Sequence, residues 1–196
     1  MIITAQQVKE LRDKTLASVS DCKKALEESG GDFVKAQEIL RRRGKQVAEK
    51  RAGKETRQGI IEYYVHSNKK IGALVELNCE TDFVAKNDKF RELAHDIALH
   101  VASMNPQYLE AADIPQEVLE KKRNEFMEEI KNSGKPEAVQ KQILEGKMKK
   151  FSEEISLLEQ PFVKNPDEKI KDLVNEYTGK IGENIKIGKF IRLEIL

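Results

Sequence analysis

Apolar residues repeat with two different periods along the chain, and the first period is helical. Over the first fifty residues they recur every three to four positions, which is typical of amphipathic helices. A first helix is predicted to begin at a capping box formed by Thr4 and Gln7. A second is predicted to start near Ser20 or Asp21 and to stop at Gly30-Gly31.

A third helix is predicted to begin at its cap, Asp32, with Gly44 as a stop or a kink. Three such short helices enclose little core and no pocket. Residues 1–53 are therefore interpreted as a docking domain rather than as a site of chemistry. The polar stretch from Val47 to Gln58 is interpreted as a helical or flexible linker. Residues 54–196 are expected to form the core domain.

After this linker the period of the apolar residues changes to two. They alternate along Ile61–Val65 and along Ile71–Leu77, on either side of a turn at residues 67–70, which predicts a β-hairpin. The clearest helical pattern of the chain then runs from Phe90 to Val101, and Asn105-Pro106 is expected to end that helix.

The C-terminal half of the chain predicts a helical hairpin, a last helix and a last strand. In the hairpin, residues 113–158, Ser133-Gly134 closes one helix and Pro136 opens the next. The last helix is predicted to run from Asn165-Pro166 to Gly179, and residues 184–196 to form the strand. The predicted fold class is α+β, in which helices pack on one face of a three-stranded antiparallel sheet and the hairpin leaves the main body.

Composition narrows the class of protein. The 196 residues are 39% apolar and 35% charged. No apolar run approaches the roughly 18–20 residues of a membrane span, and the first residues lack a signal-peptide pattern. Cys22 and Cys79 lie without the spacing of a zinc or redox motif, which indicates reduced thiols in a cytoplasmic protein. The net charge of +1 does not favour nucleic acid as a partner.

The sequence contains no recognisable catalytic motif. Among its three histidines, His95 and His100 lie five residues apart, whereas two metal ligands on one helical face are three or four apart. Neither a glycine-rich phosphate loop nor a nucleophile elbow is present. A binding protein without catalytic residues, metal or cofactor is therefore predicted.

Two stretches of the chain resemble the signatures of the elongation factor Ts family. Residues 77–85, LNCETDFVA, resemble the central signature. Residues 8–12, VKELR, and 21–26, DCKKAL, resemble the N-terminal one. Weaker resemblances follow in the same order along the whole chain, at residues 133–136, 145–150, 160–163 and 181–185. One departure is that Val19-Ser20 stand where the family usually has Met-Met.

The resemblance implies a guanine-nucleotide exchange factor that binds elongation factor Tu carrying GDP. Such a factor disturbs the magnesium and phosphate site of its partner, so that GDP leaves and GTP can enter. The N-terminal helices are implied to be of the ubiquitin-associated type and to dock on the nucleotide-binding domain of the partner. In the segment Thr81–Val84, Phe83 resembles the wedge of the family, and Asp82 beside it helps to dislodge the ion.

Further contacts and a second copy of the chain are also expected. The candidate secondary contacts with elongation factor Tu are Arg12, Val19, Lys23 and His66. A symmetric homodimer is expected, because long members of the family carry two related strand–helix lobes and this chain carries one. The edges of a three-stranded sheet also invite association.

Three alternatives remain open at this stage. From the residues alone, Thr81 or Asp82 could cap the following helix while Phe83 and Val84 belong to the core. The first fifty-three residues alone would fit a ubiquitin-associated-type adaptor. The many lysines would fit a ribosome- or RNA-binding factor, for which Tyr63 and Tyr64 are the nearest stacking candidates.

Overall fold

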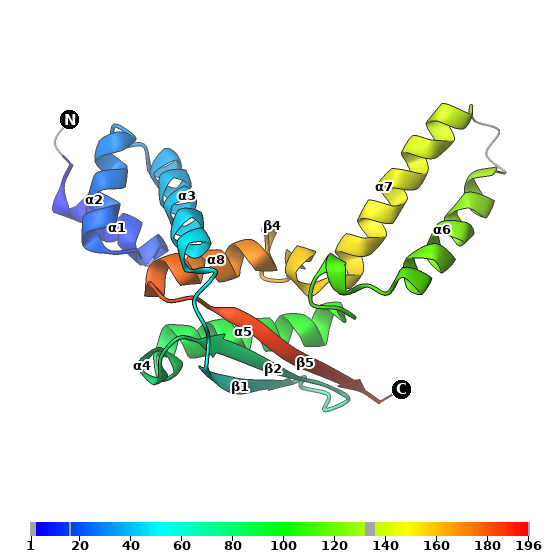
Figure 1. Ribbon diagram of the computed structural model, residues 1–196. Coiled ribbons are helices and arrows are strands. Elements are labelled where there is room, and N and C mark those ends of the chain that lie inside the picture. The colour runs from blue at the N-terminus through cyan, green and yellow to red at the C-terminus, as the bar shows by residue number, and fades with distance from the viewer. Residues whose placement is uncertain (1–2, 16, 132–135, 196) are drawn as a thin grey trace. The chain divides into compact units, whose positions relative to one another are not determined.

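The computed structural model describes residues 3–15, 17–131 and 136–195, and Figure 1 shows its ribbon. The fold is α+β, as predicted. Its main sheet is antiparallel with the strand order β1-β2-β5, formed by β1 (Gln58–Val65), β2 (Ile71–Cys79) and β5 (Lys186–Glu194).

The chain divides into two compact units, each assembled from three segments. The first unit contains Met1–Glu62, Val75–Asp96 and Asp172–Gly188. The second contains Tyr63–Leu74, Ile97–Lys171 and Lys189–Leu196.

Three helices open the first unit and lie side by side in Figure 1: α1 (Ala5–Thr15), α2 (Val19–Glu28) and α3 (Phe33–Arg51). Their caps follow from local sequence. The predicted capping box is present, since Thr4 N–H donates to Gln7 Oε1 at 2.9 Å and Gln7 N–H to Thr4 Oγ1 at 3.2 Å. Asp32 caps α3 as predicted, by accepting the N–H of Lys35. The helix α2 begins earlier than expected, because Ser18 is its cap.

Of the two roles predicted for Gly44, a stop or a kink in the third helix, the stop is wrong, since α3 continues to Arg51. Gly179 likewise does not end α8 (Ile170–Ile181), and Gly182, with a φ of 82°, follows the helix end instead. The two misjudged glycines face each other, and a Cβ added at Gly179 would lie 2.5 Å from the Cα of Gly44. Gly179 is a glycine because two helix backbones approach closely there, and not because a helix ends, whereas a Cβ at Gly44 would make only ordinary contacts at 3.8 Å.

This close approach gives a stability prediction with an internal control. Gly179→Ala is expected to destabilise the protein by about 1–3 kcal/mol, because the new methyl group meets backbone that cannot move aside. Gly146 also lies inside a helix, α7 (Glu137–Ile155), but nothing comes within 4 Å of a Cβ there. Gly146→Ala is therefore expected to stabilise by roughly 0.5–1 kcal/mol. Urea unfolding of both variants checks this, and an equal gain in both would contradict the close packing.

The helix α5 (Asp88–Met104) and one face of β2 supply most of the buried apolar residues around the sheet. All six residues that predicted the helix are buried: Phe90, Leu93, Ala94, Ile97, Ala98 and Val101. Alternate residues of β2 are buried as well: Ala73, Val75, Leu77 and Cys79. The predicted hairpin is confirmed, and Asn105, with a φ of 50°, follows the end of α5 as expected.

The opposite face of the sheet is apolar and exposed in the second unit. The hydrogen bond from His66 N–H to the carbonyl of Ile71 places Tyr63 opposite Leu74, and the bond from Ile195 N–H to the carbonyl of Lys70 places Ile191 opposite Leu74 from the other side. Alternation along each strand adds the rest of what we call the outer sheet face: Tyr63, Val65, Leu74, Ile191, Leu193 and Ile195, all exposed.

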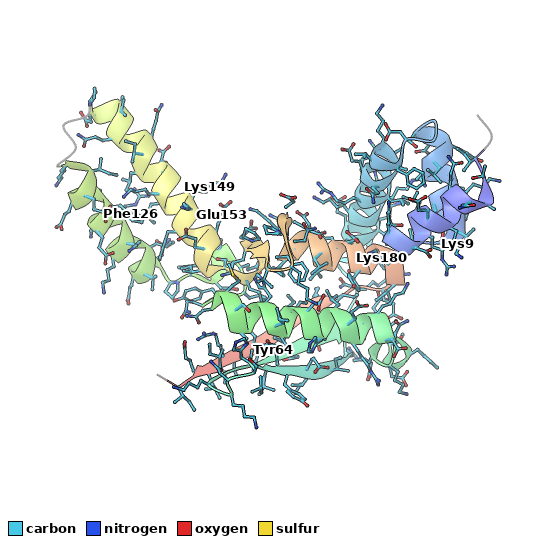
Figure 2. The ribbon with its side chains drawn as sticks, turned by 180° about the vertical axis from the view of Figure 1, so that it is seen from behind. Lys9, Tyr64, Phe126, Lys149, Glu153 and Lys180 are labelled. Carbon is cyan, nitrogen blue, oxygen red and sulfur yellow. The ribbon has the colours of Figure 1, made fainter. Side chains whose placement is uncertain are left out.

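The second unit also contains the predicted helical hairpin, made of α6 (Gln116–Lys131) and α7, which lie side by side in Figure 1. Figure 2 shows Phe126 on the side of α6 that faces α7, where its ring packs edge-to-face on Phe151 with the centroids 6.4 Å apart. The Nζ atoms of Lys122 and Lys147 lie 5.0 and 4.8 Å from the centroid of the Phe126 ring. The predicted stop at Ser133-Gly134 lies outside the described residues.

The prediction that the last helix starts at Asn165-Pro166 is wrong. Residues Asn165–Lys169 form the strand β4, which pairs with β3 (Pro161–Phe162), and α8 begins only at Ile170. Ion pairs from Lys169 to Glu153 and Glu159, at 3.1 and 2.9 Å, fix the end of this strand. A run of polar residues forms a strand here because its partners supply the pairing, and not because its own pattern alternates.

Candidate functional site

The segment Thr81–Val84 lies at the start of the short helix α4 (Asp82–Ala85), directly after β2. Thr81 is the cap, since its Oγ1 accepts the N–H of Val84 at 3.4 Å. Ala85 is buried and Val84 is half-buried. The ring of Phe83, by contrast, is 81% exposed. The capping part of the first alternative therefore holds for Thr81, whereas Phe83 as a core residue is excluded.

Asp82 carries a negative charge beside this ring. Its carboxylate is exposed and accepts a hydrogen bond from Lys86 Nζ at 2.8 Å. That bond, with the charge of Lys86, holds the pKa of Asp82 below its usual value. At neutral pH the segment consequently presents an apolar ring and an ionised carboxylate next to each other on the surface of the first unit.

A carboxylate from a distant part of the chain holds the backbone that precedes α4. The Oε2 atom of Glu183 accepts the N–H groups of Glu80 and Thr81, at 3.1 and 3.0 Å. Its Oε1 atom accepts the hydroxyl of Thr81 at 2.7 Å. All three bonds join one side chain to two consecutive residues, so Glu183 fixes the turn that leads into Asp82 and Phe83.

The side chain of Glu80 in turn accepts a hydrogen bond from the residue that follows Glu183. It accepts the N–H of Asn184 at 2.6 Å, and Arg51 Nη1 lies 3.0 and 3.2 Å from its two oxygens. The side-chain amide of Asn184, through its Nδ2, donates to the carbonyl of Lys54 at 2.7 Å. These bonds join Arg51, Glu80, Thr81, Glu183 and Asn184, which we call the Glu183 network.

Sequence reasoning assigned no role to Glu183, Arg51 or Glu80. A signal for Glu183 existed, because residues 181–185 were one of the weaker resemblances to the family. Their position next to the central signature could not be read from the sequence, since the two stretches are about a hundred residues apart.

The candidate docking residues lie on the surface of the N-terminal helices. Arg12 on α1 and Lys23 on α2 are exposed, and the side chain of Val19 is also exposed. Val19 and Lys23 are four residues apart on α2 and therefore share one side of that helix. His66 belongs to the second unit and directly follows β1. Its Nδ1 lies 3.2 Å from the hydroxyl of Tyr64.

The buried histidine His100 forms a hydrogen bond within the protein through each of its two ring nitrogens. Its Nδ1 accepts the N–H of Val163 at 3.2 Å, which leaves Nε2 to donate to Gln160 Oε1 at 3.0 Å. Burial lowers the pKa of His100 to about 4, so this side chain is neutral at physiological pH. Within residues 3–15, 17–131 and 136–195, no group of three or more His, Cys, Asp and Glu side chains is placed to hold a metal ion.

Both cysteines are free and buried, and burial raises the pKa of the Cys79 thiol to about 11. None of the helices in the described part of the chain combines the length and the apolar character that a membrane crossing requires.

Comparison with known proteins gives one family over the whole chain. The family model described as "Elongation factor TS" matches residues 3–195. Elongation factor Ts of Thermodesulfovibrio yellowstonii is 54% identical over 195 residues, which cover 100% of this chain and 97% of the relative. Elongation factor Ts of Thermosipho melanesiensis is 52% identical over 194 residues, which cover 99% of each chain.

A third relative, elongation factor Ts of Carboxydothermus hydrogenoformans, is 51% identical over 194 residues, which cover 99% of this chain and 89% of the relative. These matches extend far beyond residues 1–53, on which the adaptor alternative depended. The chain therefore belongs to the elongation factor Ts family and has the role of a translation elongation factor.

Proposed function

We propose that this protein binds elongation factor Tu in its GDP-bound form and accelerates the release of GDP, so that GTP can bind in its place. It does so without covalent chemistry, metal or cofactor of its own. The observation that carries the proposal is the exposed ring of Phe83, which stands beside the charged Asp82 on a turn held by the Glu183 network.

An exposed apolar ring on a fixed backbone suits a wedge. Such a ring gains free energy when a partner buries it, and apolar anchors of this kind dominate many interfaces. If the pocket for Phe83 exists only in the nucleotide-free shape of elongation factor Tu, binding shifts the partner toward that shape. The effect is reciprocal. If the factor lowers the affinity of elongation factor Tu for GDP by some ratio, GDP lowers its affinity for the factor by the same ratio. Each 1.4 kcal/mol of this coupling changes the affinity about tenfold.

The residues around Phe83 have separate roles in this proposal. The carboxylate of Asp82 acts on the magnesium ion of the partner and helps to dislodge it. Thr81 holds the turn, and Val84 adds a half-buried apolar contact at its edge. His66, in the second unit, is a secondary contact with elongation factor Tu.

We assign docking to residues 1–53, a ubiquitin-associated-like helical domain, and exchange with dimerisation to the core domain of residues 54–196. The contacts expected on the nucleotide-binding domain of the partner are Arg12, Val19 and Lys23, which are exposed on α1 and α2. The protein acts in the cytoplasm, where translation elongation takes place, and needs neither nucleic acid nor a membrane for this role.

The direct test is the release of labelled GDP from elongation factor Tu, measured with and without this protein. We expect release to accelerate with increasing protein, and no acceleration at saturation would overturn the proposal.

Binding of this protein to RNA, titrated against salt, tests the RNA alternative, because RNA affinity would fall steeply as salt rises.

Docking predicts a change in affinity without a change in maximal rate. Arg12→Glu combined with Lys23→Glu is expected to raise the concentration that gives half-maximal exchange about tenfold, since charges at a contact mainly govern association. The maximal rate should stay close to that of the parent protein. Lys24→Glu combined with Arg41→Glu makes the same change of charge at other exposed positions and serves as the control. Equal effects of the two pairs would contradict the assigned contacts.

We also propose that the protein is a symmetric homodimer, with the outer sheet face as the interface. Six apolar side chains on one exposed face form a surface of the kind that marks protein contacts. Two-fold dimers bury the same patch of both copies and are the commonest oligomers.

A further inference from the structure

We propose that Glu183 and Arg51 are positioning residues for nucleotide exchange, which hold the segment Thr81–Val84 so that Phe83 and Asp82 meet the partner in one orientation. This inference rests on the proposed exchange function and adds residues to its machinery that touch neither nucleotide nor magnesium.

The first argument is that α4 cannot orient itself. It has four residues, whereas isolated helices shorter than about 12–15 residues are marginal in water. Its side chain Phe83 is 81% exposed and contributes little anchoring to the protein core. The direction in which Phe83 points must therefore be set by contacts before and after the helix, and Ala85 is the one buried residue within it.

Glu183 supplies the contact before the helix. A charged acceptor forms stronger hydrogen bonds than a neutral one, and Glu183 accepts three of them from Glu80 and Thr81. The reverse bond, from Asn184 N–H to the carboxylate of Glu80, closes a ring between residues 80–81 and 183–184. Two opposed sets of bonds restrict both the position and the rotation of the turn that carries α4.

Arg51 connects this ring to the docking helices. It is the last residue of α3, the helix whose N-terminal half packs with α1 and α2 around the small core of Leu11 and Leu26. Its ion pair with Glu80 spans 3.0 Å, and the Glu80 side chain is largely shielded from solvent. All these residues belong to the first unit. When α1 and α2 dock on elongation factor Tu, α3 and Arg51 thus fix where Phe83 points.

The experiment measures GDP release from elongation factor Tu as a function of factor concentration. Glu183→Ala removes all three acceptor bonds and is expected to lower the maximal exchange rate about tenfold, because small errors in placement are costly to rate. The half-maximal concentration should change about twofold or less, since the docking surface on α1 and α2 is untouched.

Conservative substitutions of Glu183 and Arg51 distinguish a positioning role from a general loss of folding. The amide of Glu183→Gln can accept the two N–H groups through its oxygen and donate to the Thr81 hydroxyl, so most of the maximal rate should return. Arg51→Gln leaves the Glu183 bonds intact, and should therefore fold even if Glu183→Ala does not. It is expected to lower the maximal rate about threefold, with Arg51→Lys restoring it. Glu38→Ala, at an exposed position of α3, is the control and should change nothing.

A double-mutant cycle gives the decisive result. If Glu183 acts by orienting Phe83, Glu183→Ala should have little further effect once Phe83→Ala has removed the ring. In the Phe83→Ala background, Glu183→Ala should then lower the maximal exchange rate about threefold or less. The same tenfold loss in both backgrounds would overturn the inference, as would full maximal rates in stable Glu183→Ala and Arg51→Gln proteins. A parent protein that fails to accelerate GDP release would instead overturn the proposed function itself.

Discussion

Phe83→Ala is expected to slow GDP release from elongation factor Tu about thirtyfold at a given factor concentration, because a lost anchor of about 2 kcal/mol corresponds to that ratio. The free energy of unfolding should stay nearly unchanged, since the ring is 81% exposed and its loss leaves no cavity. A buried phenylalanine would behave differently: its truncation costs about 3–5 kcal/mol of stability. Unfolding and exchange measured on the same preparation distinguish these cases.

Two further variants make the Phe83 result specific. Val34→Ala removes an exposed apolar side chain from α3, outside the exchange segment, and should alter neither stability nor exchange. Asp82→Ala should cost little stability, because Thr81 and not Asp82 is the cap of α4, and should still slow exchange strongly. A stable Phe83→Ala protein with full exchange activity would refute the wedge.

The pH dependence of exchange follows from the state of Asp82. The hydrogen bond and charge of Lys86 lower the pKa of this carboxylate, so it is ionised throughout the neutral pH range. Its contribution to exchange should therefore be constant across neutral pH.

Elements with strong local patterns could be predicted from the sequence. The helix α5 follows from six apolar residues at helical spacing, and the β1–β2 hairpin from alternation on both sides of a turn. The errors at Gly44 and Gly179 arise at one place, where α3 meets α8. A glycine that ends a helix and a glycine that admits a second helix look alike in sequence, and only the pairing of α3 with α8 decides between them.

The candidate site was predictable only in part, for a similar reason. The resemblance to the family located residues 81–84, but the exposure of Phe83 depends on which side of α4 faces the core. The Glu183 network joins residues that are about a hundred positions apart, such as Thr81 and Glu183. Hydrogen bonds of that range leave no periodic signal in a single sequence.

Leu193→Glu is expected to convert the proposed homodimer into monomers. The side chain of Leu193 is 67% exposed within one chain, so a glutamate there should leave the fold intact. In a dimer formed through the outer sheet face, the same change would place a carboxylate from each copy in an apolar interface. An unpaired buried charge costs about 3 kcal/mol or more, which raises the dissociation constant at least a hundredfold.

Light scattering over a series of micromolar concentrations measures this directly, against the monomer mass of 22.4 kDa. Ala112→Glu adds the same charge at an exposed position outside the outer sheet face and should leave the dimer unchanged. Exchange measured on the monomeric variant then shows whether dimerisation matters for activity, because Asp82 and Phe83 lie in the other unit. A parent protein that is monomeric throughout the series would refute the homodimer. A dimer that persists in Leu193→Glu would exclude this face as its interface, because two unpaired charges within an apolar contact would destabilise it strongly.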